Sequence, residues 1–200
     1  SSNWTNPENI TRLKSIENEI GLFKKTQQEI EEIARTLENN PAQKILFDQA
    51  EPLEKIIVAT VSEMIKLEMK HEMTPQNKRV VGILANIETT TSLALERADE
   101  YLLSGEKEFK KESLENWKKN KTYIEILHGN ENLLSKEQLK FFQNLEYSLK
   151  QFGPLLKEII NIRSGEKWNI ANHWLRLKVV PASFRMKEVL NDMTIIQEQL

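Results

Sequence analysis

The last 33 residues of this chain carry a heptad pattern that stays in register to the final residue. Hydrophobic or seam positions recur in alternating steps of four and three at Trp168, Asn172, Leu175, Val179, Ala182, Met186, Val189, Met193, Ile196 and Leu200. Such spacing predicts a long helix that packs along a partner helix. No glycine, proline or basic last turn closes the pattern. We therefore expect this helix to continue in the parent protein and to connect this domain to a further part of it.

Composition favours long helices and excludes several classes of function. Charged residues make up 29% of the 200 residues and aromatic residues 7%, with only six glycines and six prolines. The formal net charge of −2 gives no electrostatic case for binding nucleic acid or an anionic membrane surface. The absence of cysteine excludes disulfides, thiolate metal sites and thiol nucleophiles, and it leaves the cellular compartment open.

Turn residues divide the chain into six expected helices, and period-2 alternation typical of strands does not persist anywhere. The helices are expected from Pro7 to about Asn39, from Ala42 to His71, from Gln76 to Ser104, from Glu106 to Leu127, from Ser135 to Arg163, and from Trp168 to the end. The fold class predicted is thus all-α: an up-down bundle of about six long helices forming one domain over residues 1–200.

The first and last helix junctions resemble each other. Each has an arginine at the end of one helix (Arg35, Arg163) and a proline well inside the next (Pro52, Pro181). An interior proline costs about 3 kcal/mol in a helix, so matching positions suggest duplicated kinked hairpins at about 10–73 and 136–200, with a middle hairpin at about 76–128. Two unrelated proline kinks are the alternative.

Short connections make neighbouring helices antiparallel. Both chain ends then lie at one end of the bundle, and the turns near Asn40, Gly105 and Gly165 lie at the other. This is the layout of a loop between two membrane spans.

Two segments carry a resemblance to a known family. WNIANHWLRLKVVPASFRMKEVLNDMTIIQEQL resembles the last helix before the second membrane span of bacterial chemoreceptors (methyl-accepting chemotaxis proteins), and LALERADEYLLSGEKEFKKESLENW resembles a helix turn frequent in their periplasmic domains and in those of sensor histidine kinases. The resemblance implies the four-helix-bundle or helical bimodular type, with two stacked four-helix modules sharing long helices as one form. It also implies a periplasmic ligand-binding domain of an inner-membrane receptor, a weak homodimer, and signal transduction by helix displacement after binding an organic acid or amino acid.

Three arginines are the candidate ligand-binding residues. Arg97 and Arg163 fall on the apolar seams of their helices and Arg35 lies beside one, all near the same end of the predicted bundle. A guanidinium that faces the interior needs an anionic partner, and its geometry fits a carboxylate. The alternative is that each arginine pairs with a nearby glutamate (Glu32, Glu96, Glu166) or points into water.

Trp168 and Asn172 begin the last helix next to Arg163, and we expect them to line the same site. The structural alternative is that Trp168 covers the core and Asn172 fixes the helix register.

Nothing in the sequence predicts catalysis, a metal site or a cofactor. His71, His128 and His173 lack the spacing of metal ligands, and no glycine-rich phosphate loop or nucleophile motif occurs. We therefore expect a non-enzyme. The alternatives to direct sensing are a histidine kinase sensor domain that recognises a periplasmic binding protein, and a structural helical scaffold.

Overall fold

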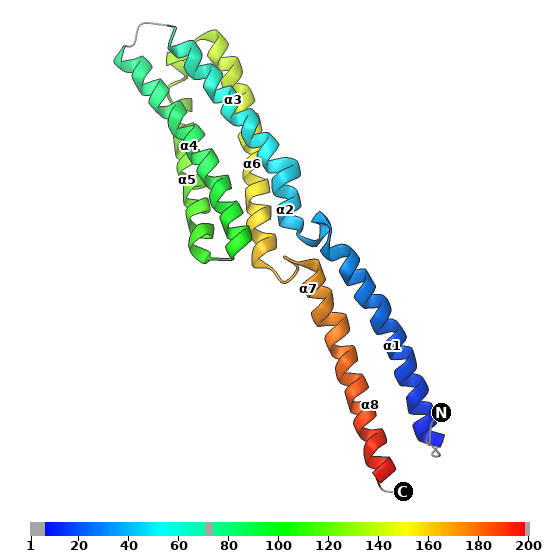
Figure 1. Ribbon diagram of the computed structural model, residues 1–200. Helices are drawn as coiled ribbons and strands as arrows, with labels where there is room; N and C mark the ends of the chain where they lie inside the picture. Colours follow the sequence, from blue (N-terminus) through cyan, green and yellow to red (C-terminus); the bar gives the residue numbers. More distant parts are fainter. Residues whose placement is uncertain (1–6, 71–73, 199–200) are drawn as a thin grey trace. The chain divides into compact units, whose positions relative to one another are not determined.

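The computed structural model describes residues 7–70 and 74–198, and throughout these ranges the regular structure is helical, without a strand. The segments are α1 (Pro7–Ala34), η1 (Leu37–Asn39), α2 (Pro41–Ile45), η2 (Leu46–Ala50), α3 (Glu51–Glu68), α4 (Pro75–Ser104), α5 (Lys107–His128), η3 (Glu131–Leu133), α6 (Lys136–Ser164), α7 (Ile170–Trp174), η4 (Leu175–Val179) and α8 (Val180–Glu198). Because α2–η2–α3 and α7–η4–α8 are each continuous, the chain forms six long helices packed antiparallel, as predicted (Figure 1). The expected helix ends at His71 and Leu200 lie outside the described residues.

The chain divides into two compact units. The helix-pair unit comprises Ser1–Asn40 and Asn169–Leu200, and the bundle unit comprises Pro41–Trp168. No helix in the described part of the chain is long and apolar enough to cross a membrane.

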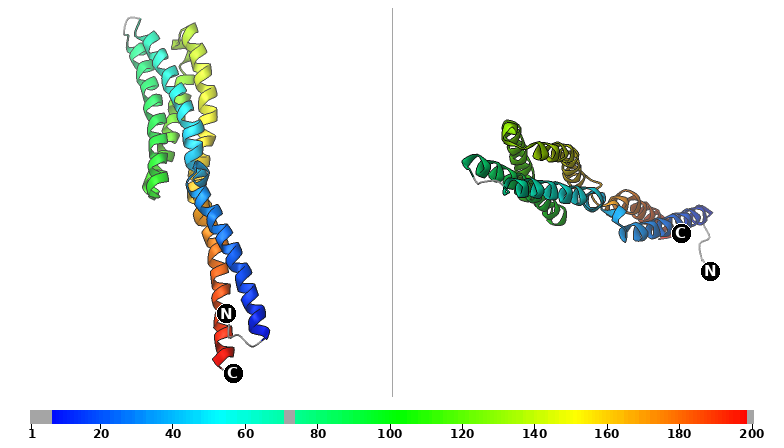
Figure 2. Two further views of the ribbon diagram at one scale, coloured as in Figure 1. Left: turned by 45° about the vertical axis from the view of Figure 1, so that its right-hand side comes forward. Right: turned by 90° about the horizontal axis from the view of Figure 1, so that it is seen from above.

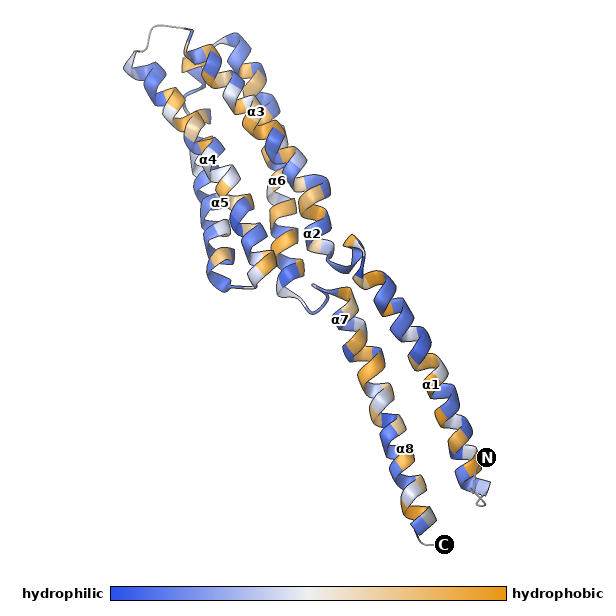
Figure 3. Ribbon diagram, in the orientation of Figure 1, coloured by the Kyte–Doolittle hydropathy of each residue, from blue (hydrophilic) through white to orange (hydrophobic). Residues whose placement is uncertain are grey.

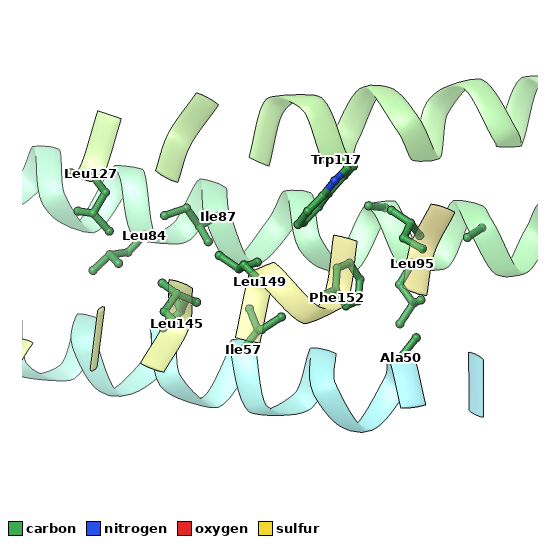
Figure 4. Close-up of a cluster of buried hydrophobic side chains, with 14 of the residues drawn as sticks. Ala50, Ile57, Leu84, Ile87, Leu95, Trp117, Leu127, Leu145, Leu149 and Phe152 are labelled. Atoms are coloured by element: carbon green, nitrogen blue, oxygen red, sulfur yellow. The ribbon is translucent and has the colours of Figure 1, made fainter. Parts of the chain in front are cut away.

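The bundle unit is a four-helix bundle. α3 packs against α4 and α6, and α4 packs along α5, whereas α5 and α6 meet over only a short stretch. Figure 4 shows side chains from all four helices meeting in one interior, among them Leu84, Leu145 and Phe152. The apolar positions expected on the seams of α4 and α6 are buried, so the helical period of the sequence locates this core correctly.

The helix-pair unit contains α1 and the continuous helix α7–η4–α8, which run antiparallel side by side (Figure 2). Lys178 pairs with Glu29 at 3.8 Å, and Arg185 further along α8 pairs with Glu19 earlier in α1 at 3.3 Å. The start of α1 and the end of α8 therefore lie at the same end of this unit.

The seam predicted for the last helix faces α1 from Val179 to Met193, whereas its earlier positions Asn172 and Leu175 are exposed. Ala182 and Met193 are buried, and the seam positions between them are half-buried. In α1 the heptad positions predicted to face a partner helix drift away from the buried side: Thr26 is buried, whereas the heptad position Gln27 is exposed. These heptad positions include Ile16, Ile20, Phe23, Gln27 and Ile30. A straight helix has 3.6 residues per turn, so a strict seven-residue pattern rotates out of the interface over several turns.

Pro52 and Pro181 each lie two residues after the end of a π-helical turn, whereas Pro154 lies inside the regular α-helix α6. Pro52 is the second residue of α3 and follows the five-residue η2, and Pro181 is the second residue of α8 and follows the five-residue η4. Each π-turn is itself preceded by a five-residue α-helix, α2 or α7. Proline cannot donate the bond of an α-helix, and the wider turn accommodates it without ending the helix. The two junctions thus share the same local geometry, and a duplication of the hairpins stays a prediction.

Candidate functional site

Arg163 and Trp168, two of the predicted site residues, lie together at one end of the bundle unit. The guanidinium carbon of Arg163 is 4.1 Å from the centre of the Trp168 ring and 5.7 Å from that of the Tyr101 ring. Its Nε donates a hydrogen bond to the carbonyl of Leu102 at 3.0 Å. That carbonyl belongs to the last turn of α4, where carbonyls lack helical donors, so Arg163 caps α4 while lying between two rings.

The turn after α4 is built around this arginine. Gly105 has φ of 75°, the left-handed conformation that closes many helices, and its N–H bonds the Tyr101 carbonyl at 2.9 Å. A Cβ at Gly105 would lie 2.6 Å from Nη2 of Arg163. Glycine is therefore required here by the backbone conformation, and a Cβ would in addition displace the guanidinium end of Arg163.

A lysine-rich hollow of about 620 Å³ borders the same end of the bundle unit. We call it the tip hollow; its lining residues are Tyr101, Lys107, Lys110, Lys111, Leu114, Glu115, Lys118 and Ser164. Ser164 Oγ lies 3.0 Å from the Tyr101 hydroxyl and accepts a bond from Lys110 Nζ at 3.0 Å. Four lysines against one glutamate make the hollow attractive to an anion.

Arg97 is held by carboxylates of its own unit. It pairs with Glu100, with Glu112 at 3.1 Å and with Glu96 at 4.0 Å. The hydrogen bond with Glu100, and then the neighbouring negative charges, raise the pKa of Arg97 further above its ordinary value. In this structure Arg97 therefore pairs with glutamates, which was the alternative to ligand binding. A role of Arg97 in binding a ligand stays a prediction.

Arg35 and Asn172 belong to the helix-pair unit, whereas Arg97, Arg163 and Trp168 belong to the bundle unit. Arg35 follows the end of α1 and is exposed. Asn172 is exposed in the first turn of α7, and its N–H bonds Oδ1 of Asn169, the residue that caps this helix, at 2.9 Å. The structure thus brings Arg163 and Trp168 together, and convergence of all five residues stays a prediction.

Asp99, two residues after Arg97, is a partly buried carboxylate among like charges. Burial raises the pKa of Asp99, and the carboxylates of Glu51 and Glu100 raise it further. A raised pKa in the folded state means that the charged form opposes folding at neutral pH. This opposition disappears when acid protonates the group in both the folded and the unfolded chain.

Replacing Asp99 with Asn should consequently stabilise the protein at pH 7 and have no effect at low pH. Because the group is only partly buried and solvent screens its charge, the gain should be only a few tenths of a kcal/mol, a rise in Tm of about 1 °C. Thermal unfolding of D99N and of the exposed control D48N should be compared between pH 7 and about pH 3. A gain that persists at the lower pH would contradict the electrostatic explanation.

A second and larger hollow lies between α5 and α6. We call it the α5–α6 groove; it has a volume of about 740 Å³ and is lined by Trp117, Asn120, Lys121, Ile124, Glu125, Glu146, Leu149, Lys150, Gly153, Pro154, Lys157, Glu158, Asn161 and Ile162. The groove exists because α5 packs mainly on α4 and leaves its other flank open along α6.

Asn120 is the polar residue at the floor of this groove, and the sequence analysis does not single it out. Its side-chain nitrogen donates to α4, toward the Ile87 carbonyl at 2.9 Å, Thr91 Oγ1 at 2.8 Å and Thr90 Oγ1 at 3.1 Å. Its Oδ1 is buried without a partner. The sequence did contain a signal for the groove. Gly153 and Pro154 occur in the middle of a long helix, where both residue types are unfavourable.

No known family model, curated protein or solved structure matches this chain. The fold alone therefore defines its class, an all-α chain of six long helices with a four-helix bundle unit that carries two hollows of different chemistry.

Proposed function

We propose that this chain is the extracytoplasmic sensing domain of a transmembrane receptor of the chemoreceptor type, and that it binds a small organic anion. The observation that carries the proposal is the tip hollow, whose four lysines lie beside the Tyr101–Ser164 pair and next to the Arg163 cluster of the same unit. A sensor histidine kinase is the second candidate, because the two receptor types differ in their output domain and share this kind of sensing domain.

The chemistry of the tip hollow suits a carboxylate ligand. Ammonium groups in a concave surface raise the local concentration of anions, and Lys110 already donates to Ser164 at the wall. Terminal nitrogens of Arg163 offer the bidentate geometry that carboxylates prefer. An organic acid or an anionic amino acid would meet both kinds of donor.

Transmission would use the direct continuity from this cluster into the last helix. Trp168 stacks on Arg163, and the next residue, Asn169, caps α7. A ligand that favours one position of Trp168 would bias the position of α7–η4–α8 along α1. Such a ligand signals only through its preference for one of two arrangements, not through affinity alone.

The proposal includes a weak homodimer formed by the helix-pair unit. Large apolar side chains on α1 and α8 are exposed. Figure 3 shows hydrophobic residues along the length of both helices. Val180 and Phe184 lie four residues apart on α8, about half a turn from Ala182, which faces α1; Leu177, in η4, is exposed at the edge of the α1 contact. A second helix pair would cover this outer stripe and complete a four-helix arrangement.

The anion proposal can be tested by thermal shift with citrate, succinate, malate and glutamate. At a concentration 100 times its Kd, a ligand stabilises the native state by about 2.7 kcal/mol, a rise in Tm of several degrees. We expect at least one of these anions to produce the shift, and K110A and R163A to reduce it strongly. The control K140A removes an exposed lysine of α6 that does not line the hollow and should respond like the original protein.

Because R163A also removes a helix cap, its far-UV spectrum must match that of the original protein before its response is interpreted. If none of the four anions shifts Tm, or if K110A and R163A respond unchanged, the anion site is refuted. A binding-protein receptor or a structural scaffold would then be the better explanation.

A further inference from the structure

The α5–α6 groove is chemically unlike the tip hollow. We infer that it is a second ligand site, for an uncharged and largely apolar small molecule that donates one O–H or N–H hydrogen bond to Asn120. The inference does not depend on the anion site, because the lining residues of the two hollows do not overlap.

The floor of the groove is aromatic and closely packed. Trp117 is only 7% exposed, and its ring centre lies 5.5 Å from that of Phe152. A Cβ on Gly153 would lie 2.6 Å from the Trp117 ring, so the glycine lets the indole lie directly on the α6 backbone. Ile124 and Leu149 add aliphatic surface on the two sides. A flat or branched apolar molecule would find dispersion contacts and lose water here.

The unpartnered oxygen of Asn120 specifies what polar group the ligand should carry. Both hydrogens of the side-chain amide are committed to acceptors on α4, which fixes Oδ1 as the atom left over. A buried acceptor without a donor costs about 1–3 kcal/mol. Because Asn120 is fully buried, a ligand reaches this oxygen by displacing the side chains that cover it; a hydroxyl or N–H that does so would recover this energy, whereas an anion would be repelled by the same oxygen.

Pro154 leaves a second hydrogen-bond acceptor, the backbone carbonyl of Lys150, without its helical donor. It has no N–H, so the carbonyl of Lys150, one turn earlier in α6, lacks the donor that an α-helix provides. Lys150 and Pro154 both line the groove. The polar groups that await partners in this wall and floor are therefore acceptors.

The charges around the groove do not select a charged ligand. Three lysines (Lys121, Lys150, Lys157) are balanced by three glutamates (Glu125, Glu146, Glu158). A cationic head group would need several acceptors to offset its desolvation, and the buried floor offers only the neutral oxygen of Asn120. An uncharged molecule is the class that satisfies the floor and the balanced rim together.

A matched pair of probes tests the hydrogen bond directly. 2-Naphthol carries the donor, and 2-methoxynaphthalene has the same rings without it. In ¹H–¹⁵N spectra, 2-naphthol should shift the Trp117 indole and Asn120 side-chain amide signals saturably. Loss of one hydrogen bond to a buried acceptor should weaken binding of the methoxy compound by about tenfold or more. Equal affinities would overturn the proposed role of Asn120.

A variant whose side chain fills the α5–α6 groove tests whether the ligand binds there. Lys121 lines the groove and is exposed, so K121W should fold and should abolish 2-naphthol binding. Thr122 is the next residue and is exposed but does not line the groove, so T122W should bind as the original protein does. Binding that survives K121W, or absence of saturable binding in the original protein, overturns the site.

K110A separates this inference from the anion proposal. The variant should lose the anion-induced thermal shift and keep 2-naphthol binding. If K110A also loses 2-naphthol binding, the two hollows do not act as independent sites and the inference fails.

Discussion

Replacing Gly153 with Ala should destabilise the bundle unit by about 1–3 kcal/mol, although alanine is the better helix former. The added methyl would lie 2.6 Å from the Trp117 ring. That ring is a rigid, buried group packed on Phe152, so it cannot yield as the end of a flexible side chain would. Either the ring leaves its position or α6 moves away from α5. Urea unfolding followed by far-UV circular dichroism measures the loss.

Gly82 provides the matched control. It lies inside α4, and a Cβ there would meet nothing within 4 Å. G82A should therefore stabilise the protein by about 0.5–1 kcal/mol, because alanine restricts the unfolded chain and favours the helix. If G153A proves as stable as G82A, the close approach of Trp117 to the α6 backbone is wrong.

The double variant L177E/F184E should abolish self-association while leaving the helical content unchanged. These two side chains are 63% and 62% exposed; Phe184 lies with Val180 on the outer face of α8, and Leu177 precedes them in η4, beside Leu22 of α1. Burying one large apolar side chain contributes about 1.5–3 kcal/mol, so two charges in the interface should weaken a dimer by at least a hundredfold. Sedimentation equilibrium over micromolar to millimolar concentrations should show dimers of the original protein and monomers of the variant.

Y147E is the control for this experiment. Tyr147 lies on α6 in the bundle unit and is 68% exposed, so the same kind of substitution there should leave the association constant unchanged. A monomeric original protein at millimolar concentration, or a variant that still dimerises, would refute the proposed pairing of helix pairs.

The helix ends were predictable because local chemistry decides them. Thr74 precedes Pro75 and caps α4 by accepting a bond from the Asn77 N–H, and Ser135 with Gln138 forms the capping box expected for α6. Gly105 closes α4 in the left-handed conformation. These signals act within three or four residues, so no knowledge of distant contacts is needed to recognise them.

The sequence also located the two proline interruptions, but not how the helices accommodate them. Pro52 and Pro181 were expected to kink their helices, and in the structure each follows a π-helical turn within a continuous helix. Whether a helix bends, breaks or widens at proline depends on which packing contacts hold it on either side. Sequence pattern alone does not contain those contacts.

For the candidate site, the sequence identified residues and the tertiary structure decided their partners. Arg97 and Arg163 both fall on apolar seams, yet Arg97 is neutralised by three glutamates while Arg163 lies between Tyr101 and Trp168. The partners of Arg163 come from α4 and from the segment after α6, far apart in the sequence. A heptad pattern shows which side of a helix is inward, but it does not show what that side meets.

The sequence by itself determined that this protein is all-α, where most of its helix ends lie, and which faces of α4 and α6 are buried, because these follow from capping chemistry and helical periodicity over a few residues. Only the tertiary structure decided that the chain forms two units and that α5 and α6 leave a groove. It also decided that the Oδ1 atom of Asn120, a residue lining this groove, is buried without a hydrogen-bond partner. Those features depend on how far apart neighbouring helices settle. That spacing is set by the combined packing of many side chains, such as Trp117 on Gly153, and no local pattern encodes it.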